Sequence, residues 1–304
     1  MSLLDHIVNE NISVNNSMDA ESQRSAMRGR KFRLWQKTAP LFDAEKAKNP
    51  EFPDNSRKDG VLRLHNVSVP SMIFMPADTK NNPAAPAVLV CPGGGYAYTA
   101  YELEGFAICN FLNSIGIAAF LLNYRSPDQR AAAYADAARA MRFIRFHAKE
   151  FMVDPNRIGA IGFSAGAHLC AMISAAKEQP YQAEDEIDTL SYKPNYTALI
   201  YPAYLATPEL QLAPEFEINA AVPPTFLVQT EDDGIGIYNA LAWYNELFKA
   251  GVKAEMHLFE CGGHGYSIDY RPGIPVTGWQ KLAEKWFRLR IKEEIPEFSK
   301  EVVS

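Results

Sequence analysis

Short apolar runs recur along the middle of the chain, and they constrain its fold more than any other feature. They occupy residues 87–91, 117–124, 158–163, 197–204 and 224–230, and longer segments separate most of them. Runs without polar alternation are typical of parallel strands that are buried on both faces. Because parallel neighbours need long crossovers, usually helices, the pattern predicts an α/β fold with a mostly parallel central sheet and helices on both faces.

Helical periodicity fills several of the segments between and after these runs. Residues 238–251 and 278–294 have helical patterns, and an alternating strand is predicted between them at 254–260. Within residues 131–150, apolar side chains recur at spacings of four, three and four residues, which places them on one face of a helix: Ala137, Met141, Ile144 and Ala148. These segments therefore predict the crossover helices and a closing helix.

The first part of the chain has a different character. Residues 1–55 are polar and irregular, which predicts an N-terminal arm packed on a single α/β domain of residues 56–304. Residues 62–69 and 71–77 alternate apolar and polar side chains, as paired or bent antiparallel strands at a sheet edge would. Later, the proline-containing stretch 205–222 predicts a loop or small lid.

Charge and composition disfavour several classes of function. The 304-residue chain has a formal net charge of −6 and no cluster of lysine and arginine, so nucleic acid is not expected as a partner. No signal peptide and no apolar stretch of about 18 residues is visible, so we expect no membrane partner and a cytoplasmic location. The cysteines lack CxxC spacing and are expected to be buried reduced thiols: Cys91, Cys109, Cys170 and Cys261.

A serine flanked by glycines follows one of the apolar runs. The pentapeptide GFSAG at residues 162–166 lies between the run at 158–163 and an apolar helical stretch. A serine hydroxyl can act as a nucleophile when a tight strand-to-helix turn projects it towards a base, and that turn needs small residues two positions on either side. We therefore interpret Ser164 as a catalytic nucleophile. The alternative is a glycine-rich turn in another α/β fold.

Three consecutive glycines, residues 93–95, follow the run at 87–91. Acyl transfer needs backbone amides upstream of the nucleophile, together with the amide of the residue after it, to stabilise an oxyanion. We predict that Gly94, Gly95 and Ala165 form this oxyanion hole. A phosphate-binding loop is disfavoured because neither GxGxxG nor a following Lys-Ser/Thr pair is present, and a flexible turn is the other alternative.

A base and an acid occur later in the chain. Among the six histidines, His264 lies in a glycine-flanked loop just after the last predicted strand. The run at 224–230 is followed by three acidic residues at 231–233. We predict a triad of Ser164, Asp233 and His264, with Asp232 as the alternative acid. The acid would hold the histidine tautomer whose Nε2 accepts the serine proton.

With these motifs the chain resembles the α/β-hydrolase fold esterases of the acetylesterase and acetyl xylan esterase-like family, which are related to hormone-sensitive-lipase-like esterases. The segments that carry the resemblance occur in the family's order: LWQKTAP, VPSMIFMPA, VLVCPGGGY, LNYR, DPNRIGAIGFSAGAHL, PPTFLVQTEDDG and GGHGY. The chain departs from these families at Pro92, where the lipase-like group has histidine, at Ala167, where glycine is usual, and in the loop after Asp233.

The resemblance implies an enzyme that hydrolyses short-chain esters such as acetyl esters, without a metal or cofactor. It implies acetylated carbohydrates, such as acetylated xylo-oligosaccharides, as the substrates. The expected partner is a small-molecule or oligosaccharide ester, and a homo-oligomer is compatible with the sequence. Tyr96, Tyr98 and Tyr101 follow the glycines at places where a ring can stack on a sugar, although tyrosines in such loops more often pack locally; of the three, Tyr96 and Tyr98 are predicted to bind the substrate. Competing interpretations are a general short-chain carboxylesterase, a peptidase of the same fold and a catalytically silent binding module.

Overall fold

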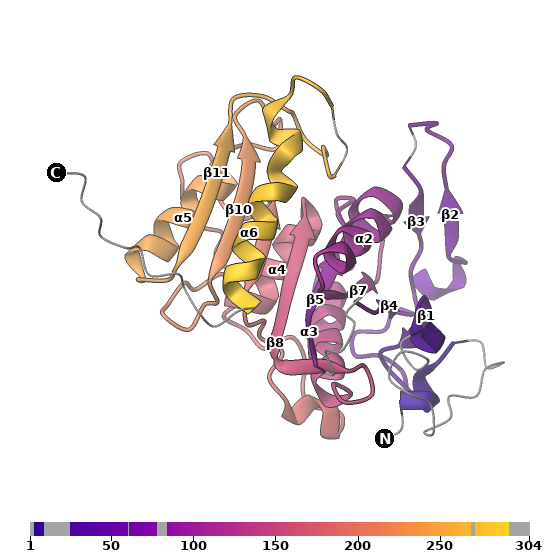
Figure 1. Cartoon of the computed structure of the whole chain (residues 1–304). Helices are drawn as coiled ribbons and strands as arrows, with labels where there is room; N and C mark the ends of the chain where they lie inside the picture. Colours follow the sequence, from indigo (N-terminus) through magenta and orange to yellow (C-terminus); the bar gives the residue numbers. More distant parts are fainter. Residues whose placement is uncertain (1–2, 9–24, 60, 78–83, 269–270, 292–304) are drawn as a thin grey trace.

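A computed structural model describes residues 3–8, 25–59, 61–77, 84–268 and 271–291 of the chain (Figure 1). The elements before the first long helix are η1 (Leu3–His6), β1 (Arg30–Arg33), η2 (Lys46–Lys48), β2 (Phe52–Asp54), β3 (Arg63–His65), β4 (Ser71–Met75), β5 (Ala85–Cys91), β6 (Thr99–Ala100) and the π-helical turn η3 (Glu102–Phe106).

The remaining elements alternate between helices and strands, as the spacing of the apolar runs predicts. They are α2 (Ala107–Ser114), β7 (Ala118–Asn123), α3 (Arg130–Phe146), β8 (Val153–Phe163), α4 (Ala165–Ala175), η4 (Glu186–Thr189), β9 (Thr197–Ile200), β10 (Thr225–Thr230), α5 (Tyr238–Lys249), β11 (Ala254–Phe259), η5 (Pro275–Gly278) and α6 (Trp279–Ile291).

The main sheet has eight strands in the order β1-β4-β7-β5-β8-β9-β10-β11. Every pairing from β7 to β11 is parallel, whereas β4 pairs antiparallel with both β1 and β7. A second sheet of three short strands has the order β2-β3-β6. The mostly parallel sheet with helices between its strands confirms the predicted fold class.

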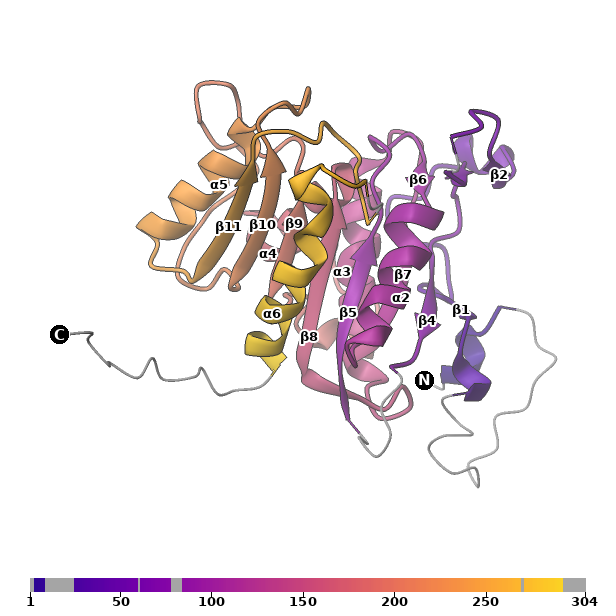
Figure 2. The ribbon, with the colours of Figure 1, turned by 45° about the horizontal axis from the view of Figure 1, so that its top comes forward.

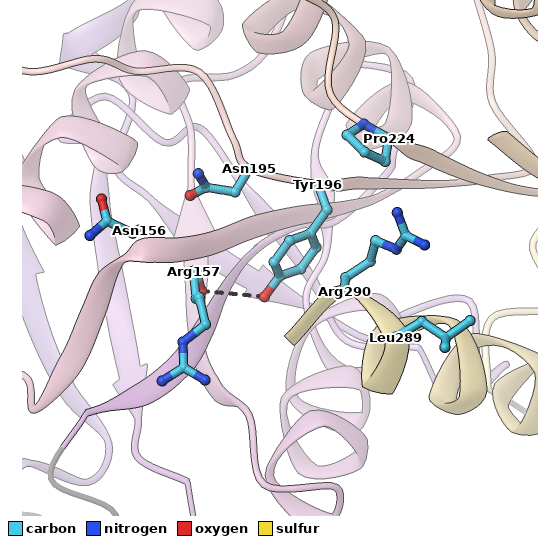
Figure 3. A pocket seen from close by; sticks show the side chains of 7 residues that line it. All are labelled: Asn156, Arg157, Asn195, Tyr196, Pro224, Leu289 and Arg290. Atoms are coloured by element: carbon cyan, nitrogen blue, oxygen red, sulfur yellow. Dashed lines mark hydrogen bonds between the residues drawn. The ribbon is translucent and has the colours of Figure 1, made fainter. Parts of the chain in front are cut away.

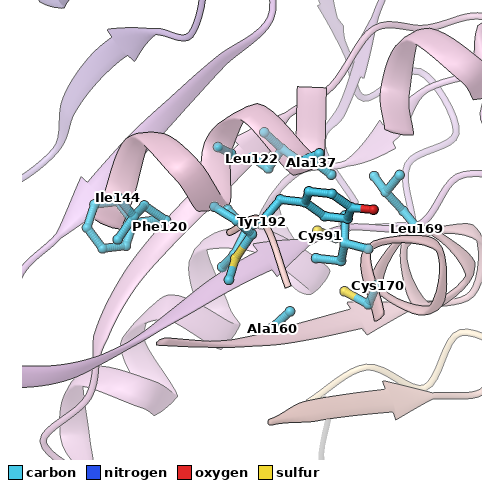
Figure 4. Close-up of a cluster of buried hydrophobic side chains, with 14 of the residues drawn as sticks. Cys91, Phe120, Leu122, Ala137, Ile144, Ala160, Leu169, Cys170 and Tyr192 are labelled. Atoms are coloured by element: carbon cyan, nitrogen blue, oxygen red, sulfur yellow. The ribbon is translucent and has the colours of Figure 1, made fainter. Parts of the chain in front are cut away.

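Helices cover both faces of the main sheet, so its strands are buried on both sides (Figures 1 and 2). On one face, side chains of α3, α4 and α5 pack with alternate residues of the strands, such as Leu89 and Cys91 of β5. Figure 4 shows Cys91 in this cluster, together with Ala137 of α3 and Leu169 of α4. On the other face, α2 and α6 pack with the intervening residues, such as Val90. This two-sided burial explains why the strands read as continuous apolar runs.

The predicted antiparallel edge is correct only in part. β4 does pair antiparallel within the main sheet, but β3 pairs with β2 and β6 in the smaller sheet, so the two predicted strands do not pair with each other. The edge of the main sheet is β1, which lies in the segment predicted as an irregular arm. The side chains of Arg30 and Phe32 are buried there, an alternation too short to be recognised in a polar sequence.

Helix α3 is confirmed, although it ends at Phe146 and is not amphipathic. Every residue from 132 to 144 is buried, including the charged Arg139. The guanidinium of Arg139 forms ion pairs with Asp185 at 2.6 Å and with Asp188 at 2.9 Å. Because paired charges can be buried, the polar positions that suggested an exposed face lie inside the protein.

The later elements agree with the sequence pattern. Helix α5, strand β11 and helix α6 occupy the predicted segments, and positions 292–294 of the predicted closing helix lie outside the described residues. Residues 205–222 contain no helix and no strand, as predicted for a loop. In the part of the chain that the structure describes, no helix has both the length and the apolar character needed to span a membrane.

Candidate active site

Four strands of the main sheet bring the predicted residues to one edge of the sheet. The glycine loop follows β5, Ser164 follows β8, Asp233 comes after β10 and His264 comes after β11. All four strands are parallel, so their carboxyl ends lie at the same edge. Open α/β sheets bind ligands at this edge, because loops from several strands meet there.

Ser164 is held in a strained turn between β8 and α4. Its backbone has φ 53° and ψ −117°, outside the regions that L-residues prefer, and its amide donates to the carbonyl of Ile200 on β9. A Cβ on Gly162 would lie 2.2 Å from the carbonyl oxygen of Gly166, and one on Gly166 would lie 2.0 Å from that of Cys91. A side chain at either position would clash with the backbone around the turn, so both positions require glycine.

The side chains of Ser164, His264 and Asp233 form a continuous chain of contacts. Nε2 of His264 lies 2.8 Å from Oγ of Ser164, and Nδ1 of His264 lies 2.8 Å from Oδ2 of Asp233. A carboxylate can only accept, so Nδ1 carries the hydrogen and Nε2 is free to accept the serine proton. Asp233 is 5% exposed, whereas His264 lies at the surface, within reach of a substrate.

Asp232, the alternative acid, has a different set of partners. Its carboxylate accepts from the amides of Gly263 at 2.8 Å and Gly262 at 3.1 Å, and these bonds lower the pKa of Asp232. Adjacent residues of the chain thus point to different partners. Asp232 holds the loop that carries His264, while Asp233 contacts the imidazole itself.

The predicted oxyanion donors lie around Ser164 with their amides unused. Gly94 has φ 131° and Gly95 has φ 64°, conformations that L side chains rarely adopt. Within the described residues, the amides of Gly94, Gly95 and Ala165 donate to no protein acceptor. Ala165 begins α4, where the first amides of a helix have no intrahelical acceptor. Free amides next to a nucleophile are what an oxyanion hole requires.

The structure also places three residues at the site that the sequence analysis did not identify. The buried carboxyl of Glu104 accepts from the amide of Gly93 and from the hydroxyl of Tyr201. Tyr204 is 38% exposed, and its hydroxyl would lie 3.8 Å from a Cβ on Gly95. No motif marks these residues, although the end of the run at 197–204 could have drawn attention to its two tyrosines.

The tyrosines after the glycine loop are placed differently from one another. Tyr96 is 1% exposed and its hydroxyl lies 2.7 Å from Nδ1 of His168, so the predicted stacking of Tyr96 on a substrate is wrong because its ring packs in the interior. Tyr98 is half-buried, with its ring next to His65 and beneath the guanidinium of Arg63. Tyr101 is also half-buried and packs against the ring of Phe106, 5.1 Å between centroids.

The cysteines are free, and the expectation of burial holds for three of them. Cys91, Cys109 and Cys170 are buried, but Cys261 is exposed because its loop leaves the sheet after β11. Among the described residues, no group of three or more His, Cys, Asp or Glu side chains is arranged to hold a metal ion.

A pocket lies away from these residues, at the opposite end of the sheet. Figure 3 shows the side chains that line it. It is lined by residues near the start of β8, by those before β9 and β10, and by the end of α6: Asn156, Arg157, Asn195, Tyr196, Pro224, Leu289 and Arg290. Because the amino ends of the parallel strands lie there, this pocket is distinct from the site around Ser164.

Known proteins similar to this chain include several esterases. The model of the BD-FAE family matches residues 72–204, a segment that contains the glycine loop and Ser164. The crystal structure of an acetyl ester-xyloside bifunctional hydrolase from Caldicellulosiruptor lactoaceticus is 32% identical, with a TM-score of 0.71, and the match covers 86% of this chain and 96% of that one. A thermophilic esterase from Thermogutta terrifontis is 26% identical, with a TM-score of 0.62 over 77% of this chain and 91% of its own.

Curated relatives are longer than this chain. An acetylxylan esterase of Xylanibacter ruminicola is 28% identical over 256 residues, which are 76% of this chain and 48% of that protein. Endo-1,4-beta-xylanase B of Butyrivibrio fibrisolvens matches over 60% of this chain and 32% of its own length. The chain thus spans half or less of these two relatives. Because it is 32% identical to the bifunctional hydrolase and covers 96% of that structure, the chain belongs to the same family of α/β-hydrolase fold esterases, and the BD-FAE model matches part of it.

Proposed function

We propose that this chain is a serine carboxylesterase that hydrolyses acetyl esters of carbohydrates, with Ser164 as nucleophile, His264 as base and Asp233 as acid. The observation that carries the proposal is the pair of 2.8 Å contacts that join Ser164 to His264 and His264 to Asp233. The unused amides of Gly94, Gly95 and Ala165 support it, because acyl transfer develops negative charge on the carbonyl oxygen.

Acylation begins when Nε2 of His264 takes the proton of Ser164 while Oγ attacks the ester carbonyl carbon. The carbonyl oxygen becomes an oxyanion, to which the backbone amides around Ser164 donate. Asp233 stabilises the imidazolium that has formed, because its buried carboxylate accepts the Nδ1 hydrogen. The imidazolium then returns the proton to the leaving alcohol, the carbon–oxygen bond breaks, and an acetyl group remains on Ser164.

Deacylation repeats these steps with water in place of serine. Nε2 of His264 takes a proton from water, whose oxygen attacks the acetyl carbonyl, and the same amides hold the second oxyanion. The tetrahedral intermediate collapses when the imidazolium protonates Oγ of Ser164. Acetic acid leaves and gives up its proton to solvent, and the site returns to its starting protonation state without any group beyond those of the chain and water.

Two features support a sugar as the alcohol side. The proteins similar to this chain include an acetylxylan esterase and an acetyl ester-xyloside bifunctional hydrolase. Tyr204 adjoins Gly95 with 38% of its surface exposed, and the guanidinium of Arg130 lies 4.1 Å from its ring centroid. An aromatic ring held in this way at the mouth of the site can stack on a pyranose face.

The test compares acetylated xylo-oligosaccharides with p-nitrophenyl acetate and longer p-nitrophenyl esters. We expect both acetyl substrates to be hydrolysed, and Tyr204→Ala to raise KM for the oligosaccharides about tenfold while leaving p-nitrophenyl acetate unchanged within about twofold. Hydrolysis of p-nitrophenyl esters with no action on the oligosaccharides would leave a general short-chain carboxylesterase and refute the carbohydrate assignment.

A further inference from the structure

Glu104 is a buried carboxyl beside the glycine loop, and the mechanism above does not use it. The residue is 7% exposed and lies in η3. Its Oε2 accepts from the amide of Gly93 at 2.6 Å. A Cβ on Gly93 would lie 2.8 Å from that oxygen and 3.0 Å from Cβ of Ser164. Gly93 therefore lies between the carboxyl of Glu104 and the side chain of Ser164.

Tyr201 connects this carboxyl to the loop of the base. Its hydroxyl donates to Oε1 of Glu104 at 2.8 Å and accepts from the amide of Ser267 at 3.2 Å. Its ring lies edge-on to the imidazole of His264, with centroids 5.0 Å apart at 65°. A second link runs alongside, because Oγ of Ser267 donates to the carbonyl of Leu103 at 2.6 Å.

We propose that Glu104 is a positioning residue of the esterase, an inference that rests on the proposed function. Its two oxygens tie the glycine loop, through Gly93, to the histidine loop, through Tyr201. The oxyanion donors and the imidazole of His264 thereby keep a fixed separation during both half-reactions. Since catalytic groups lose much of their effect when displaced by about 1 Å, such a link acts on the rate rather than on substrate binding.

A carboxyl suits this place for two reasons. It accepts the hydrogen of the Gly93 amide, so the amides of this loop that remain free to donate to an oxyanion are those of Gly94 and Gly95. Each of its two oxygens accepts from one donor, Oε1 from Tyr201 and Oε2 from Gly93; burial raises the pKa of Glu104, and these two hydrogen bonds act in the opposite direction.

The experiment compares Glu104→Gln with Glu104→Leu, and measures kcat per active serine after titration with a fluorophosphonate. In Glu104→Gln the amide oxygen can accept from Gly93 and the amide nitrogen can donate to Tyr201, so we expect kcat within about fivefold of wild type. In Glu104→Leu both partners lose the carboxyl, and we expect kcat to fall about a hundredfold with KM changed less than about threefold.

Tyr201→Phe provides a second variant if the leucine variant does not fold, since it removes only a hydroxyl. We expect its kcat per titrated serine to fall about tenfold, with rescue neither by excess substrate nor by lower temperature. An unchanged kcat per titrated serine in Glu104→Leu or Tyr201→Phe would overturn the proposal, as would a glutamine variant as slow as the leucine variant. A wild-type chain without esterase activity would instead refute the proposed function.

Discussion

Replacing Asp233 with asparagine is expected to slow the enzyme while leaving its fold intact. The Oδ2 atom lies 2.8 Å from Nδ1 of His264, and the residue is 5% exposed. Two unit charges about 4 Å apart interact by about 4 kcal/mol at an effective dielectric constant of about 20. Losing that stabilisation of the imidazolium corresponds to about a thousandfold in kcat, and a wrong tautomer would increase the loss.

The matched control is Asp232→Asn, which neutralises the adjacent carboxylate. Asp232 is exposed and bonds to two backbone amides rather than to the imidazole, so its kcat should stay within about tenfold of wild type. The assay is steady-state hydrolysis of p-nitrophenyl acetate, with circular dichroism spectra to verify that both variants are folded. The reasoning fails if Asp232→Asn loses as much activity as Asp233→Asn, or if Asp233→Asn keeps a tenth of the wild-type rate.

Two further predictions concern stability. Gly166→Ala should lower the free energy of unfolding in urea by about 3 kcal/mol or more, because its Cβ would meet backbone carbonyl oxygens at 2.0 and 2.5 Å. The control is Gly278→Ala, which has open space around its Cβ and should change the free energy of unfolding by less than about 1 kcal/mol. Equal urea midpoints for the two variants would contradict this. Burial lowers the pKa values of His6, His147 and His168, so the unfolded chain takes up protons near pH 6.5 that the folded chain does not. The free energy of unfolding should therefore be highest above about pH 6.5 and should decrease below it, by up to about 1.4 kcal/mol per pH unit for each histidine. A free energy of unfolding that is constant between pH 7.5 and pH 5.5 would refute this.

The parts of the fold that follow from local patterns could be predicted from the sequence. The continuous apolar runs predicted the parallel strands, because these strands are buried on both faces. Backbone crowding around Ser164 requires glycine at positions 162 and 166, and both glycines are visible in the pentapeptide. Strand β1 could not be predicted, because four residues with two arginines give too little alternation. Its place at the edge depends on the partner strand β4, which is distant in the sequence.

The site shows the same division. Asp232 and Asp233 are adjacent and chemically identical, so only the direction in which each side chain points distinguishes their partners. Glu104 has partners 11 and 97 residues away, and no spacing rule connects them. Tyr96 follows the glycines as a substrate-binding tyrosine would, yet its hydroxyl bonds to the buried His168. Side-chain direction and long-range contacts are set by tertiary packing, which residue types alone do not specify.

The most direct test of the account is to identify the residue that carries the acyl group. Wild-type protein treated with a fluorophosphonate should gain one phosphonyl group, which peptide mapping by mass spectrometry should locate on Ser164, with esterase activity lost in proportion to labelling. Ser164→Ala should remain unlabelled and retain less than about a thousandth of the wild-type rate. A label on another residue, or esterase activity in Ser164→Ala above that level, would contradict the assignment of Ser164 as the nucleophile.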